Sequence, residues 1–453
     1  MRISAEQGDL TMRHTTRTLL ERMLSPLCGF DQRISFMLRS RLEPRLLAAG
    51  AELAGVHVLR KEPKPKAGAY HIGGSGVVLE EAVIRTLGET IERYSQMVSE
   101  ISNHHTIIWA SYEQLVDRGE RVIATDKLRF FSEKQYSRPE FLFRPFSRDT
   151  PMGWIKVPSL IDDSENWIPA QLLLVGYVVR AAEGERWLLP AVTTGSAAHT
   201  KHDHALRNAL LELIQIDSAM GHWYSATTAP EIIADKRTRT LDRLIARQFD
   251  CRRPMPTFYW LPNPDLPGMT VACVLRETPG NMPAAVVGLG CELKLVEAMY
   301  KALVEAVGVA QLGKIVLLER TTGVRAESAS QIDPGRIFDL DTNVAFYSGP
   351  DNRFYLDAKF GDGSSVRASE LPDDFTRDTR QEIRLLVDGF RDTNKELAFV
   401  DLTTVDIRQL GFTALRVWSP DTISLSLPSA PPAIHPRFAA FGGFQDDRPH
   451  PYP

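Results

Sequence analysis

The chain has 453 residues, of which 43% are hydrophobic, 24% charged and 8% aromatic, the proportions of a folded globular protein. Its 53 Lys and Arg against 57 Asp and Glu give a formal net charge of −4, which disfavours generic binding to nucleic acid or to an anionic membrane. The longest dense apolar stretch, around residues 172–179, is too short to span a bilayer, so no transmembrane helix is expected.

The amino terminus carries Glu6, Asp9 and Glu21 and has no apolar stretch followed by a small-residue cleavage site. It therefore does not have the pattern of a secretory signal, and we expect a cytoplasmic protein. The four cysteines form neither a C-x-x-C pair nor a zinc-ligand pattern with histidine, which indicates reduced, scattered residues.

In chain order, apolar residues at helical spacing predict two helices within the first 50 residues, and the charged, proline-containing segment 61–70 predicts a loop. Predicted strands at 106–109, 171–179, 269–276 and 284–287 then alternate with helical stretches. This alternation predicts an α/β or α+β architecture. Residues 348–374 have the composition of a surface insertion. The last segment, 420–453, contains eight prolines and is expected to be extended.

One pattern, A-x-x-x-[TA]-L-x-E, occurs three times, at residues 82–89, 205–212 and 298–305. Each copy follows a segment that contains glycine, so we expect a repeated unit of loop then helix. Glycine-rich turns that open helices offer N–H groups to phosphates, and nearby carboxylates bind Mg²⁺. The pattern thus favours a site for a nucleotide with a metal. A duplicated structural unit without a shared ligand role remains the alternative.

Other patterns favour structural roles. The histidines around the second copy have no further ligands near them in sequence, so we assign capping or surface roles and no zinc site. Neither glycine-containing segment completes G-x-G-x-x-G or G-x-S-x-G, which disfavours a dinucleotide site and a nucleophile elbow. We expect the aromatic residues Tyr94, Trp223 and Tyr224 to line the core or a nucleotide pocket.

Three segments together resemble the nucleotide-site segments of the YcaO family. They are GGSGVVLEEAVIRTLGETIERYSQ, TTGSAAHTKHDHALRNALLELIQIDSAMGHWY and GLGCELKLVEAMYKALVEAVG. The resemblance covers roughly residues 18–430, which we take as one ATP-binding cyclodehydratase domain between an N-terminal extension (1–17) and a proline-rich tail (431–453). The final PHPYP is similar to the P-x-P-x-P ending of the azoline-forming branch of that family.

The resemblance implies a YcaO fold and ATP- and Mg²⁺-dependent cyclodehydration of Cys, Ser or Thr in a ribosomally made precursor peptide. It assigns metal binding to Glu89, Glu92, Glu212 and Glu305. It assigns nucleotide contacts to Ser75, Gly76, Arg93, Thr194, Gly195 and Gln215. It gives the carboxylate of Pro453 a part in proton transfer. As partners it implies a separate E1-like leader-binding protein, a flavin-dependent azoline dehydrogenase and a second copy of the chain within a complex.

The sequence departs from the family pattern at several positions. Ser75 stands where the family has lysine, Gln215 and Ile216 where it often has Glu-Arg, and Gly308 where it commonly has glutamine. These changes leave open a non-catalytic scaffold that has lost ATP turnover. A thioamide-forming enzyme is a further alternative, against which the P-x-P-x-P ending argues.

Overall fold

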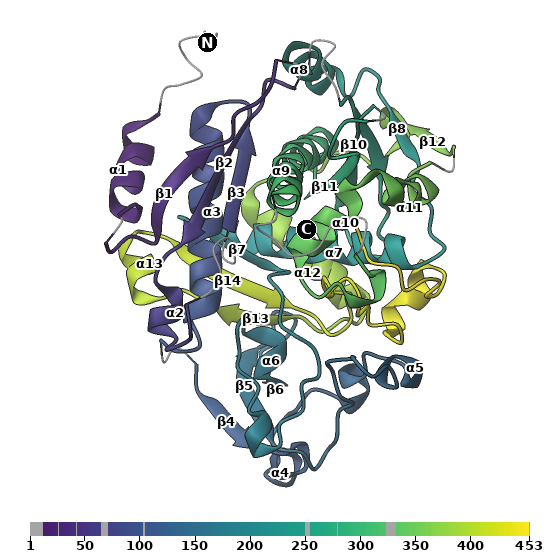
Figure 1. The fold of residues 1–453 in the computed structure, drawn as a ribbon. Helices are drawn as coiled ribbons and strands as arrows, with labels where there is room; N and C mark the ends of the chain where they lie inside the picture. Colours follow the sequence, from purple (N-terminus) through teal and green to yellow (C-terminus); the bar gives the residue numbers. More distant parts are fainter. Residues whose placement is uncertain are drawn as a thin grey trace.

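The computed structural model describes residues 12–25, 27–41, 43–64, 71–102, 105–249, 254–278, 280–322, 332–361 and 363–452. Strands of these residues form four sheets, and long helices pack on them, so the expected combination of helix and sheet is confirmed (Figure 1). No helix in the described part of the chain is long and apolar enough to cross a membrane.

The four sheets have short, mostly antiparallel strands. The first contains β1 (Asp31–Phe36), β2 (Leu47–Leu53) and β3 (His71–Gly76), in that order. The second has the order β11 (Ala285–Glu292), β10 (Met269–Arg276), β9 (Pro256–Trp260), β8 (Glu231–Ile233) and β12 (Ser365–Arg367), with β8 and β12 parallel. The third has the order β13 (Ala398–Asp401), β14 (Thr413–Trp418) and β7 (Ser196–His199). The fourth, in an inserted unit at the bottom of Figure 1, contains β4 (Ile107–Ala110), β5 (Met152–Pro158) and β6 (Glu165–Pro169).

Three long helices dominate the centre of the fold: α3 (Leu79–Val98), α7 (His202–Tyr224) and α9 (Leu295–Thr321). The remaining described helices are α1 (His14–Met23), α2 (Val56–Leu59), α4 (Tyr112–Asp117), α5 (Glu133–Tyr136), α6 (Ala170–Leu173), α8 (Arg239–Phe249), α10 (Leu340–Ser348), α11 (Arg353–Lys359), α12 (Thr379–Asp392) and α13 (Val405–Gln409).

The repeated sequence pattern corresponds to three units of a strand followed by a helix: β3–α3, β7–α7 and β11–α9. The expectation of a glycine-rich loop before each helix is therefore wrong, because most of these glycines lie within strands. A Cβ atom on Gly74 would lie 2.6 Å from the Ala82 carbonyl oxygen, and one on Gly290 would lie 2.3 Å from the Ala298 carbonyl oxygen. In these two units, glycine lets the helix backbone lie directly against its strand.

Several other local predictions need correction. The first predicted helix is present as α1, but the second is replaced by β1 and β2, which pair with each other and with β3. The strand predicted at 171–179 is absent, and Leu172 and Leu173 instead lie in the single turn α6, buried in the core of the inserted unit. The predicted insertion 348–374 contributes β12 to the five-stranded sheet and buries Leu356 and Phe360. Long-range packing, which local patterns do not report, decides each case.

The proline-rich C-terminal segment is buried against α7 and α10. Its described residues contain a six-residue 3-10 helix (Pro436–Phe441) and otherwise neither helix nor named strand, so the expectation of a wholly extended segment is corrected there. His450 and Tyr452 are buried, and Asn343 on α10 donates to both of their carbonyl oxygens, at 2.7 and 3.2 Å. Among described residues, the tail is thus part of the hydrophobic core.

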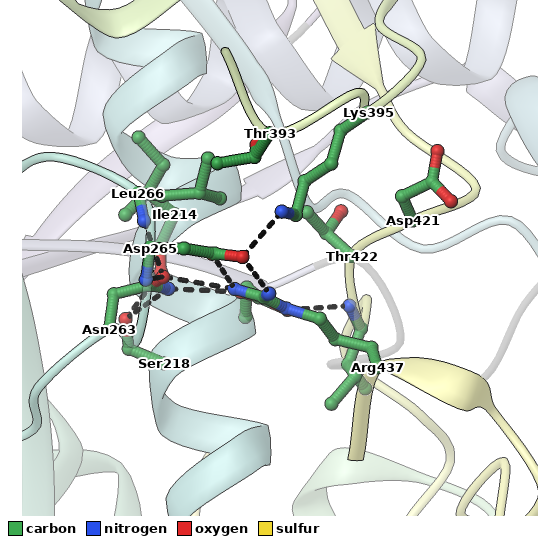
Figure 2. Close-up of polar contacts among 12 residues, drawn as sticks. Ile214, Ser218, Asn263, Asp265, Leu266, Thr393, Lys395, Asp421, Thr422 and Arg437 are labelled. Carbon is green, nitrogen blue, oxygen red and sulfur yellow. Dashed lines mark hydrogen bonds and ion pairs between the residues drawn. The ribbon is translucent and has the colours of Figure 1, made fainter. Parts of the chain in front are cut away.

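A buried ionic network fastens this segment to α7. The Arg437 guanidinium donates to both carboxylate oxygens of Asp217, with a shortest distance of 2.7 Å. It also donates to Asp265 and Asn263, at 2.9 Å each (Figure 2). Lys395 completes the network through a 2.6 Å contact with Asp265. Because Asp217 is inaccessible to solvent, these partners, and not water, compensate its negative charge.

Candidate active site

The helices of the three units carry the four predicted metal-binding glutamates. Glu89 and Glu92 lie on α3, Glu212 on α7 and Glu305 on α9. Burial, together with the charge of Glu89, raises the pKa of Glu92 to about 8. Burial and the charges of Glu92 and Glu89 likewise raise the pKa of Glu212 well above its ordinary value. The structure therefore brings these carboxylates close enough to repel one another.

Glu305 lies at the solvent-exposed side of this group. Partial removal from water by the surrounding protein, together with the negative charge of Glu89, raises its pKa, although its side chain still reaches solvent. In the part of the chain that the structure describes, no three Asp, Glu, His or Cys side chains converge on one point as they would around a single ion. The arrangement is an open array of carboxylates.

A chain of hydrogen-bonded side chains holds Glu92. The Ser196 hydroxyl, at the start of β7, lies 2.7 Å from Glu92 Oε1. Gln96, one turn after Glu92 on α3, directs its amide nitrogen at the Ser196 hydroxyl and at the Thr193 carbonyl oxygen. Ser196 is inaccessible to solvent and Gln96 is 1% exposed, so the chain lies in the interior of the protein.

Two arginines partly balance the negative charge. Arg93 donates to Glu89 over 2.7 Å, and its side chain remains partly open to solvent. Arg416, on β14, is 1% exposed and donates to the Leu173 carbonyl oxygen over 2.7 Å. Burial lowers the pKa of Arg416 to about 10, an effect that the nearby Glu212 charge opposes. Arg416 is also the cross-strand partner of Ser196.

Two departures from the family pattern lie against each other. A Cβ atom on Gly308 would lie 2.8 Å from the Ser75 hydroxyl oxygen, so α9 and β3 meet at these two small residues. Gly76, next to Ser75, is covered by Glu81, which accepts hydrogen bonds from Tyr300 at 2.6 Å and from the Val77 amide at 3.0 Å. The structure therefore uses small side chains to close this part of the site.

The residues predicted from the second segment have mainly structural contacts. Thr194 is buried and accepts a hydrogen bond from the Leu425 amide at 3.1 Å. Gly195 has a φ of +79°, and a Cβ atom there would lie 2.2 Å from the Val417 carbonyl oxygen. Gln215 is partly exposed on α7, whereas Ile216 packs into the core. The Thr194 hydroxyl is thus engaged within the protein, and the Ile216 side chain is apolar.

Pro453, the predicted source of a terminal carboxylate, lies outside the described residues. The chain that leads to it ends at Tyr452, whose carbonyl oxygen contacts Asn343. Two cavities, of about 530 and 390 Å³, lie elsewhere, at the starts of α7 and α12 and between residues 138–141 and the tail. None of the four glutamates lines them, so charge and hydrogen bonding locate the candidate site better than cavity size does.

Sequence reasoning missed three residues of this site. Gln96 follows Glu92 by four positions, so helical spacing on α3 would have placed the two side chains on one face. Ser196 directly follows the predicted Thr194 and Gly195. Arg416 is more than 200 residues from Glu212 in sequence, and only the pairing of β14 with β7 brings it to the site.

A family model described as "YcaO cyclodehydratase, ATP-ad Mg2+-binding" matches residues 73–423. Three solved structures share the fold. A heterocyclase in complex with substrate and cofactor has a TM-score of 0.73 and 16% identity over 100% of this chain and 59% of its own, so this chain spans less than two thirds of that protein.

The second is YcaO from Methanopyrus kandleri bound with AMPPCP and Mg²⁺, with a TM-score of 0.59 and 15% identity over 96% of this chain and 92% of its own. The third is a chain of the E. coli microcin synthetase McbBCD complex, with a TM-score of 0.61 and 12% identity over 94% of this chain and 98% of its own. No curated protein sequence matches the chain.

Proposed function

Because the chain belongs to the YcaO family, whose model covers residues 73–423, we propose that it is an ATP- and Mg²⁺-dependent peptide cyclodehydratase. Its substrate class is a ribosomally made precursor peptide, in which Cys, Ser or Thr becomes thiazoline or oxazoline. The observation that carries this proposal is the electrostatic coupling among four glutamates that the helices of three repeated units contribute.

The residues present fit Mg²⁺. Carboxylate oxygens are its preferred protein ligands, and the raised pKa values of Glu92 and Glu212 reflect burial and, after it, repulsion by neighbouring carboxylates, both of which a bound divalent cation would offset. Bound Mg²⁺ would supply positive charge to the phosphate oxygens of ATP.

In the proposed reaction, a thiol or hydroxyl of the peptide attacks the carbonyl carbon of the preceding amide. The resulting oxygen accepts the γ-phosphoryl group of ATP and then leaves with it as phosphate, while the amide nitrogen loses its proton and forms the C=N bond. The balance is peptide plus ATP to azoline peptide, ADP and phosphate. Arg93, partly open to solvent, contributes positive charge beside Glu89 while phosphate charge develops.

We assign the proton transfers to the terminal carboxylate of Pro453. The support is the anchoring of residues 449–452 against α10, where Asn343 and Tyr347 donate to the carbonyl oxygens of His450, Tyr452 and Pro449. Deletion of Pro453 alone, or addition of one glycine after it, moves this carboxylate while leaving the buried Tyr452 in place. Both variants should bind AMPPCP as the parent does and form rings much more slowly. Unchanged ring formation would contradict the assignment.

The decisive experiment is mass spectrometry of a precursor peptide incubated with this protein, ATP, Mg²⁺ and an E1-like partner. We expect the loss of one water per ring. Glu89→Ala should abolish it, whereas Glu297→Ala, which removes an exposed glutamate of α9 paired with Lys294, should not. Loss of activity in both variants to the same extent would count against a specific role for Glu89.

A non-catalytic scaffold is the second candidate. The contact between Ser75 and Gly308 leaves no cation at that position, and Ile216 turns into the core, so part of a phosphate clamp is missing. Release of phosphate in the presence of a precursor distinguishes the candidates. An unmodified peptide without phosphate release, given a partner that is competent with another such enzyme, would establish the scaffold.

A further inference from the structure

The side chain of Glu92 is fixed by residues that neither the sequence pattern nor the family resemblance identifies. The Ser196 hydroxyl has one hydrogen and two acceptors within reach, Glu92 Oε1 at 2.7 Å and the Thr193 carbonyl oxygen. Which acceptor it serves decides whether Glu92 has a fixed position.

Gln96 resolves this choice. Its amide nitrogen carries two hydrogens, and it contacts both the Ser196 hydroxyl and, at 3.5 Å, the Thr193 carbonyl oxygen. The amide thus occupies a lone pair of the hydroxyl and serves Thr193 itself. The hydroxyl hydrogen is then directed to Glu92, whose carboxylate accepts the stronger hydrogen bond once a bound cation keeps it ionised.

The location of this pair makes it rigid. Ser196 starts β7 and is paired in register with Arg416, while Gln96 lies on α3 one turn after Glu92. Both side chains are almost completely buried, so water does not replace them. Buried hydrogen-bond partners that orient a ligand side chain typically change metal affinity or activity by about 10- to 100-fold when they are removed.

We infer that Gln96 and Ser196 are positioning residues that hold Oε1 of Glu92 and present its other carboxylate oxygen to a divalent cation. This inference rests on the proposed function, because it takes Glu92 as a metal ligand. It adds that the geometry of that ligand is set by the chain Gln96–Ser196–Glu92, and not by the helix alone.

The test measures binding of Mg²⁺ to the full-length protein by isothermal titration calorimetry, with and without AMPPCP, beside thermal unfolding. Ser196→Ala should weaken Mg²⁺ binding by about tenfold or more. Ser196→Thr, which keeps the hydroxyl, should restore most of the affinity. Gln96→Met, which keeps the side-chain length but removes the amide, should weaken binding by a smaller factor, because the freed hydroxyl can turn to Thr193.

Thr86→Val is the matched control. Thr86 is a fully buried hydroxyl on the same helix, and it bonds only to the Ala82 carbonyl oxygen of its own backbone, at 2.9 Å. Its removal should change the melting temperature as much as Ser196→Ala does but leave Mg²⁺ affinity unchanged. A purely structural role for Ser196 predicts the same pattern for both variants.

The outcomes separate the two proposals. If Glu89→Ala binds Mg²⁺ as the parent does, the proposed metal site itself is wrong. If Glu89→Ala loses binding while folded Ser196→Ala and Gln96→Met both keep affinity within about twofold, far below the expected change, only the positioning role is overturned. Should Ser196→Ala fail to fold, Gln96→Met alone decides, since it leaves every backbone contact of β7 intact.

Discussion

Removal of the Arg437 guanidinium should lower the free energy of unfolding by a large amount. Arg437→Met leaves the fully buried Asp217 with only the Asn263 amide and the Ile423 backbone N–H, each at 2.9 Å, to balance its charge. Breaking a buried ion pair on one side costs about 3–5 kcal/mol, because the remaining charge stays uncompensated. Asp217→Asn should cost a similar amount, since it leaves the guanidinium without its closest carboxylate.

The double variant tests the cause. If the cost comes from an unpaired buried charge, Asp217→Asn with Arg437→Met should destabilise about as much as one single change, and not by their sum, so the coupling free energy should equal one single cost, about 3–5 kcal/mol. Urea unfolding followed by circular dichroism measures all three free energies of unfolding. Arg391→Met, which removes an exposed ion pair with Asp388, should stay within about 0.5 kcal/mol of the parent. Additive single effects, or single losses no larger than this control, would refute the reasoning.

Three further predictions follow from the site and its supporting contacts. The folded-state pKa of Glu92 is about 8, against an ordinary value of 4.5. Between these pH values the unfolded chain ionises and the folded chain does not, so the metal-free protein should lose stability as the pH rises. Mg²⁺ should therefore raise the melting temperature more at pH 8 than at pH 5, and an equal rise at both would contradict this prediction. Gly308→Val should lower the free energy of unfolding by about 1–3 kcal/mol through its clash with Ser75, and should cost less in a Ser75→Gly background. Gly290→Ala should lower the free energy of unfolding by at least about 1–3 kcal/mol, because a Cβ atom there would lie 2.3 Å from the Ala298 carbonyl oxygen. Gly88→Ala, where a Cβ atom would have nothing within 4 Å, should be neutral or stabilising. Equal losses of stability in the two variants would show that the contact between strand and helix is not the cause.

The sequence was most informative where a pattern is local and repeated. The three copies of the motif predict the helices that carry Glu89, Glu212 and Glu305, and helical spacing adds Glu92. The same copies led to a wrong prediction about the glycines. Gly74 and Gly290 lie in strands that pack against helix backbone, and not in a phosphate-binding loop. The sequence does not separate the two cases, because both require glycine.

The remaining features depend on contacts between distant segments. Phe36 and Leu38 fit a helical apolar pattern, yet Phe36 lies in a strand that pairs with β2, and Leu38 is exposed. Arg416 reaches the candidate site only through the pairing of β14 with β7, and the burial of Tyr452 depends on α10. No window of local sequence contains both partners of such contacts.

The contacts between strand glycines and helix backbones also determine how far along its helix each glutamate lies from the sheet. In each copy the glutamate follows the first alanine of the motif by seven residues, which is about 10 Å along a helix that rises 1.5 Å per residue. In two units that alanine touches a glycine of the preceding strand, so the height of the carboxylate above its sheet is measured from a backbone contact. The connections between units do not enter this measure, although the strands β4–β6 lie between the first two units in the sequence. A single residue added between alanine and glutamate, by contrast, would turn the carboxylate by about 100° and withdraw it from the array.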